Sequence, residues 1–123
     1  MDQYVLVEAG KNLVEALERS GVSLKAAVWV HLAEDQDWRL WLVPSAAVER
    51  RAFYRRVAEV IAAGEAEYHG LSASDTEMVG DDHPAIVALR TRSQVNGRTP
   101  TRLTTTLLNG FYLPEGIVLR MAA

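Results

Sequence analysis

The sequence predicts an α+β domain with a mainly antiparallel sheet of four or five strands and helices packed on it. Its 123 residues suit one domain that spans 1–123. With 49% apolar and 24% charged residues, the chain can build a hydrophobic core, which excludes the disordered and low-complexity classes. Helical and β-prone segments interleave in the order α-β-β-α-β-α-β-β without the strict rhythm of βαβ units, and this favours the α+β class.

The first segment has the apolar spacing of an amphipathic helix, from about Gln3 to Ser20. Asp2 can cap its first turn, and Gly21 suits the left-handed conformation that commonly ends a helix. The face that we expect to be buried holds Leu6, Ala9, Leu13 and Leu17.

Two β-prone runs, Leu24–Ala33 and Trp38–Val43, flank the acidic stretch Glu34–Asp37 and predict a hairpin. Both strands are apolar on both faces. Such a pattern indicates either a central place in the sheet or a second face that something else covers. It is the first indication of association with a partner.

The middle of the chain predicts a helix from about Ala46 to Ala63 that ends at Gly64. A loop over 65–74 and a short strand over Asp75–Gly80 follow. The run Asp81–Pro84 is typical of a helix start, with acidic caps and a proline in the first turn, and this helix reaches about Ser93.

The last segment predicts a strand from Arg102 to about Tyr112, with Asn109-Gly110 as a bulge inside it. A turn over Pro114–Gly116 then leads to a final strand over Ile117–Met121. Asn109-Gly110 is also the strongest two-residue hairpin signal in the chain, so it competes as the point of reversal.

Composition excludes several classes of protein. With no cysteine, the chain has no disulfide framework, no thiolate metal site and no cysteine nucleophile, in keeping with a cytoplasmic location. The N-terminus lacks the pattern of a signal peptide. The longest apolar runs, among them Ala26–Val30, are far short of the roughly 20 residues that span a bilayer, so we expect no membrane partner.

The net charge of −3 conceals a segregated distribution. Residues 1–48 carry a net −3 and residues 49–56 a net +3. Residues 57–83 contain no lysine or arginine and carry −7, whereas residues 84–123 carry +4. A chain polarised in this way can have local potentials that its total charge hides.

Two arginine clusters suggest nucleic-acid binding as an alternative function, because guanidinium groups bind phosphates bidentately. Tyr54, beside the first cluster, offers a ring that can stack on a base. The competing interpretation is a solvated helix face, or ion pairs with acids such as Glu49 and Glu59. The nucleic-acid hypothesis gains strength if both clusters share one face. The first cluster is Arg50, Arg51, Arg55 and Arg56, and the second is Arg90, Arg92, Arg98 and Arg102.

Catalytic and metal motifs are weak, and the sequence shows no nucleophile elbow, Walker loop, GxGxxG or HExxH. A third hypothesis, a small hydrolase-like enzyme, would use His69 as its acid–base group near Ser72, Ser74 and Asp75. Helix capping accounts for Asp81 and Asp82 beside His83, and a polar turn accounts for Glu34, Asp35 and Asp37. We therefore expect no catalytic residue, no metal and no cofactor.

Trp29, Trp38 and Trp41 exceed what a small core readily absorbs, because each ring is large and its N–H needs a partner. Tryptophan is also enriched at interface hot spots. We expect at least one of these rings to line a surface where a partner or second copy docks. His31, on the same apolar hairpin, is expected to be a core or interface histidine.

The segments AGKNLVEAL, AAVWVHLAEDQDWRLWLVPS and NGFYLPEGIVLRM resemble a small uncharacterised bacterial α+β protein family. Its members share an N-terminal helix, an apolar hairpin with a central W-R-L and a C-terminal strand that ends in aliphatic-Arg-Met. The resemblance implies one intact α+β domain and assigns no activity. Together these features favour a non-enzymatic protein-interaction module, an accessory subunit or homodimer in a bacterial cytoplasmic complex.

Overall fold

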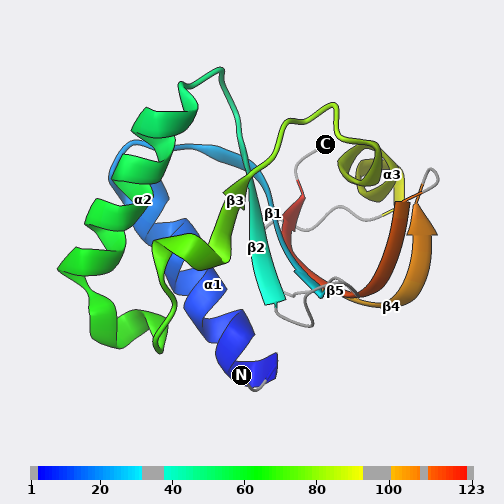
Figure 1. Ribbon diagram of the computed structural model, residues 1–123, viewed down its shortest axis with the longest axis horizontal. Coiled ribbons are helices and arrows are strands. Elements are labelled where there is room, and N and C mark those ends of the chain that lie inside the picture. The colour runs from blue at the N-terminus through cyan, green and yellow to red at the C-terminus, as the bar shows by residue number, and fades with distance from the viewer. Residues whose placement is uncertain (1–2, 32–37, 93–100, 109–110, 122–123) are drawn as a thin grey trace.

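A computed structural model (Figure 1) describes the backbone of residues 3–31, 38–92, 101–108 and 111–121, and the side chains of residues 4–31, 38–64, 67–90 and 115–121. The helices are α1 (Gln3–Arg19), α2 (Arg50–Ala63) and α3 (Pro84–Arg92), with short 3-10 helices η1 (Glu65–Tyr68) and η2 (Ala73–Asp75). The strands are β1 (Leu24–His31), β2 (Trp38–Pro44), β3 (Thr76–Met78), β4 (Thr101–Leu108) and β5 (Phe111–Met121). The α+β class and the predicted order of elements are confirmed.

The five strands form one sheet in the order β3-β2-β1-β5-β4. Three of its pairings are antiparallel, β1 with β2, β1 with β5 and β4 with β5. The fourth, between β2 and β3, is parallel, so the sheet is mixed rather than purely antiparallel. The apolar strand β1 lies at its centre, with β3 and β4 at the two edges.

The sheet is covered on both faces by helices of the same chain (Figure 1). One face packs against α1 and α2 through Trp29, Leu40, Leu42 and their neighbours. The other face packs against Ile86 and Leu89 of α3. The two-sided apolar hairpin is therefore explained by a central position and by α3, and burial of its second face requires no partner.

Helix α1 buries its predicted apolar face and ends as its sequence predicts, whereas Asp2, its expected cap, lies outside the described residues. The four residues of its apolar stripe are almost fully buried, and Gly21 has φ +97°, the left-handed conformation expected after a helix. The Val22 amide bonds to the Leu17 carbonyl at 2.9 Å, as in a Schellman motif. No helix in the described residues is long and apolar enough to cross a membrane.

The contact between α1 and the sheet is unusually close at Gly10. The Trp29 indole Nε1 donates a 2.7 Å hydrogen bond to the Leu6 carbonyl in the interior of α1. A Cβ atom added at Gly10 would lie 2.6 Å from that same nitrogen and 2.5 Å from a methyl group of Leu119. Only glycine lets the helix backbone approach the indole this closely.

One predicted helix start and one predicted helix cap need correction. Helix α2 begins at Arg50 rather than Ala46, because Glu49 is extended and its carbonyl accepts the first helical bond, from the Phe53 amide. Helix α3 is capped by a histidine and not by the acids: His83 Nδ1 accepts the Ala85 amide at 3.1 Å.

The C-terminal reversal was also predicted in the wrong place. Strand β5 runs without interruption from Phe111 to Met121, through the run at 114–116 that was expected to turn. Leu108 is the register partner of Phe111, so the chain reverses between these two residues. The two-residue connection outcompetes the proline turn because it brings two long strands into register.

We expect Gly10→Ala to destabilise the protein by about 1–2 kcal/mol, because overpacking against Leu119 and Trp29 outweighs the roughly 1 kcal/mol gain in helix propensity. Denaturant unfolding measures this loss. In a Trp29→Phe background the same substitution should cost less, because the indole nitrogen that it crowds is gone. Equal costs in both backgrounds would contradict the described contact.

Burial raises the pKa of the Tyr68 phenol above the usual tyrosine value; nearby Glu67 raises it further, and Arg19 partly opposes the shift. As pH rises, the unfolded chain therefore loses the Tyr68 proton before the folded protein does. The contribution of the protonated phenol to folding stability is intact below about pH 10 and is lost as pH rises further. We expect Tyr68→Phe to lose less stability than the natural protein between about pH 8 and pH 11. Urea midpoints across this range give the comparison, and parallel losses would contradict it.

Candidate interaction surfaces

The three tryptophans do not form a common docking surface. Trp29 and Trp41 are 1% and 3% exposed, in the cores on opposite faces of the sheet. Their side chains are thus buried by the chain's own helices, so of the three rings only Trp38 can be the one that lines a docking surface. Trp38, at the start of β2, is half-buried and is the one indole that reaches solvent.

Trp38, His31 and Glu115 form a row across three strands at one end of the sheet. His31 is the register partner of Trp38 on β2 and of Glu115 on β5. The Trp38 and His31 rings stack with centroids 4.9 Å apart and planes inclined by 14°. The Glu115 carboxylate lies 3.2 Å from His31 Nδ1, which fixes the orientation of the imidazole. The register continues from Glu115 to Thr104 on β4, at the edge of the sheet.

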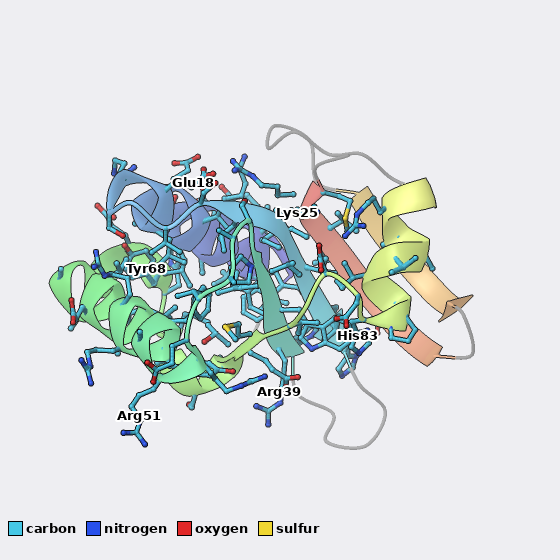
Figure 2. The ribbon with its side chains drawn as sticks, turned by 90° about the horizontal axis from the view of Figure 1, so that it is seen from above. Glu18, Lys25, Arg39, Arg51, Tyr68 and His83 are labelled. Atoms are coloured by element: carbon cyan, nitrogen blue, oxygen red, sulfur yellow. The ribbon has the colours of Figure 1, made fainter. Side chains whose placement is uncertain are left out.

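The first arginine cluster fans across the exposed surface of α2, and we call Arg50, Arg51, Arg55 and Arg56 the arginine face. Arg50 reaches the Met78 carbonyl of β3 at 3.4 Å, and Arg56 reaches the Ser20 carbonyl after α1 at 2.9 Å. Arg51 projects from α2 into solvent, on the same side of the molecule as Arg39 of β2 (Figure 2). Among the described residues, no carboxylate lies within 4.0 Å of these four guanidinium groups.

Tyr54 has a structural role that its sequence context did not indicate. Its hydroxyl accepts the Met78 amide of β3 at 2.8 Å and lies 3.5 Å from the Arg50 guanidinium. The ring is half-buried and stands edge-on to the ring of Phe53. Because its hydroxyl and its ring are both engaged, Tyr54 does not supply the exposed stacking platform that was predicted.

Arg90, the one side chain of the second cluster that the structure describes, does not lie on the same face as the first cluster. Helix α2 covers one side of the sheet, whereas Arg90 belongs to α3 on the other side and donates to the Asp81 carbonyl at 3.2 Å. The side chains of Arg92, Arg98 and Arg102 lie outside the described residues. Arg90 therefore does not extend the arginine face, and a surface shared by the two whole clusters stays a prediction.

The residues proposed for catalysis are engaged in local structure. Ser72 and Asp75 form a capping box at η2, with the Ser72 amide 2.9 Å from the Asp75 carboxylate. His69 is exposed and left-handed, with φ 50°, and no hydrogen bond links it to either residue in the described structure. A groove of about 470 Å³ between α2 and residues 70–73 has no titratable side chain in its lining. The arrangement provides no base, nucleophile and orienting group in one place.

Possible metal ligands are likewise not gathered. No group of three histidine or acidic residues suited to a metal occurs among the side chains that the structure describes. Asp81 instead forms a 3.1 Å ion pair with Lys25, and His83 caps α3 beside Trp41. The acidic residues Glu34, Asp35 and Asp37 lie outside the described residues.

Sequence reasoning missed one surface, the free edge of β4. This strand pairs with β5 on one side, and no described strand pairs with it on the other. It has eight residues, TRLTTTLL, with neither lysine nor proline. Lysine and proline on an edge strand are two of the devices by which proteins protect that edge from pairing with another chain. The β-branched composition signalled a strand, but its place at the edge depends on strand order.

The opposite edge is blocked. Met78 of β3 has its amide bonded to the Tyr54 hydroxyl and its carbonyl bonded to Arg50, so α2 occupies backbone groups that could otherwise pair with another strand. We expect Tyr54→Phe to cost about 1–2 kcal/mol of stability and to leave that amide without its acceptor. Amide hydrogen exchange should accelerate at Met78 but not at Val28 in the central strand. Unchanged exchange at Met78 would contradict this role.

Comparison with known proteins adds no assignment. No family model matches the chain, and no curated protein or solved structure matches it either. The features that bear on function are therefore the geometry of the β4 edge, the Trp38–His31–Glu115 row and the arginine face of α2.

Proposed function

We propose that this protein is a non-enzymatic protein-interaction module that works as a homodimer, with two copies joined through the edge of β4. One observation carries the proposal: β4 is a long edge strand without lysine or proline, paired on one side only within the described sheet. Such a strand presents a row of backbone donors and acceptors to another chain. The proposed setting is a bacterial cytoplasmic complex, in which the dimer acts as an accessory subunit.

The backbone of β4 can be divided into inward and outward groups. Leu108 and Phe111 flank a two-residue connection, and in such hairpins the flanking pair exchanges hydrogen bonds. Alternation then directs the backbone groups of even-numbered β4 residues toward β5. The groups that point away from the sheet belong to Thr101, Leu103, Thr105 and Leu107.

A second copy of the same strand is the occupant that fits this edge. Two antiparallel β4 strands related by a two-fold axis present the same groups to each other, which gives a closed, self-complementary contact. A register centred on Thr105 places Leu103 opposite Leu107 of the other copy and threonine opposite threonine. Matched aliphatic and threonine pairs stabilise antiparallel strands, and this register sets Arg102 opposite Leu108 rather than opposite another arginine.

This register makes Thr105 a sensitive reporter of the dimer. Thr105→Lys and Thr105→Glu would each set like charges opposite one another across the two-fold axis. We expect each variant alone to be monomeric and an equal mixture to recover a dimer through Lys–Glu pairing. Sedimentation velocity and light scattering at micromolar concentration measure these states, and circular dichroism checks that each variant is folded.

A second variant tests the edge without adding charge. Thr105→Pro removes an outward-facing amide and leaves the hydrogen bonds to β5 in place, so we expect a folded monomer. A monomeric natural protein at these concentrations would overturn the proposal. So would a dimer that persists in folded forms of all three Thr105 variants, because its interface would lie elsewhere.

A further inference from the structure

We propose that the arginine face of α2 binds the phosphate backbone of nucleic acid, without reading base sequence. This function is separate from the β4 dimer, because α2 packs near β3, at the opposite edge of the sheet from β4. The inference rests on three features of the arginine face: a charge that no described carboxylate neutralises, its anchoring, and its lack of an exposed aromatic ring.

Two of the positive charges on α2 lie at its N-terminus, where the helix dipole disfavours cations. Arg50 and Arg51 occupy the first turn, which contains no acidic residue, and Glu49 makes no side-chain cap there. Cations near a helix N-terminus are destabilised by the macrodipole, and Arg51 and Arg55 add like-charge repulsion at i, i+4 spacing. Glu59, one turn beyond Arg55, makes no ion pair within 4.0 Å with any arginine of this face. An anionic partner would relieve each of these costs.

Arg50 and Arg56, at the two sides of the arginine face, are held in place by hydrogen bonds to backbone carbonyls. One guanidinium nitrogen of Arg50 bonds to the Met78 carbonyl and one of Arg56 to the Ser20 carbonyl. Each guanidinium has five N–H donors, so donors remain for a ligand while the side chain is already positioned. Anchoring of this kind lowers the conformational entropy lost on binding.

The chemistry of the face favours phosphates over bases. Phe53 is buried and the Tyr54 hydroxyl is bonded to β3, so neither ring is presented for stacking. Guanidinium forks bind phosphate oxygens bidentately, and a duplex presents those oxygens at regular intervals. The expected ligand is therefore a nucleic-acid backbone of any sequence, bound through about four phosphate contacts.

Salt dependence gives the first test. Neutralising about four phosphates predicts a slope of about −3.6 for log K against log salt, and so about a 100-fold loss of affinity between roughly 50 and 200 mM NaCl. The measurement is fluorescence anisotropy of the full-length protein with a labelled duplex of about 20 base pairs, repeated with a second sequence. Equal affinity for the two sequences is expected, and a strong preference would overturn backbone-only recognition.

Matched variants locate the site. Arg51→Gln with Arg55→Gln should reduce the slope by about 1.8 and weaken binding about 100-fold near 50 mM salt. Lys11→Gln with Arg90→Gln removes the same charge from α1 and α3 and should leave most of the binding intact. Circular dichroism confirms folding, and Arg51→Lys with Arg55→Lys should keep the slope because the charge is kept.

Three outcomes would overturn the proposal. The first is no binding by the natural protein near 50 mM salt, and the second is equal weakening by the two double-glutamine variants. The third is competition by poly-glutamate as effective as that by unlabelled duplex, which would assign the face to an acidic protein. Failure of nucleic-acid binding leaves the sedimentation result for β4 unchanged, so the two proposals can fail separately.

Discussion

The packing of α1 on the sheet depends on one hydrogen bond and one missing methyl group. Trp29 Nε1 reaches the Leu6 carbonyl only because Gly10 lets the helix backbone approach the indole. This bond satisfies the polar atom of a large ring in the core, where an unpaired N–H would be costly. Helix α2 packs in the same apolar cluster, so the position of the arginine face follows from this contact.

Local patterns predicted much of the fold. Apolar spacing and Gly21 located α1. Two β-prone runs on either side of an acidic stretch located the first two strands. The wrong predictions fall where a contact between residues far apart in the sequence determines the local structure. Pro114 would favour a turn by itself, but pairing with β4 and β1 keeps β5 extended through that region. Likewise, the apolar second face of β1 could not reveal that α3, more than fifty residues later, covers it.

The candidate surfaces were less accessible to sequence reasoning than the fold. The arginine residues of α2 were evident in the sequence, but two facts about them depend on long-range contacts. These are the lack of ion pairs with described carboxylates and the bond of Tyr54 to Met78, which lies 24 residues away. Tryptophan content suggested an interface, yet Trp29 and Trp41 are core residues on opposite faces. The β4 edge depends on strand order, which composition does not encode.

The two ends of the sheet differ in a way that controls how far assembly can proceed. Tyr54 and Arg50 occupy the backbone of β3 at one end, whereas β4 at the other end has no such cover among the described residues. A protein whose sheet has two edges with unpaired backbone groups can add copies indefinitely and grow into a fibre. With a single open edge, growth stops after one addition. In the dimer that we propose, the Tyr54 hydroxyl and Arg50 therefore help to limit assembly to two copies, because they occupy the Met78 amide and carbonyl at the β3 edge.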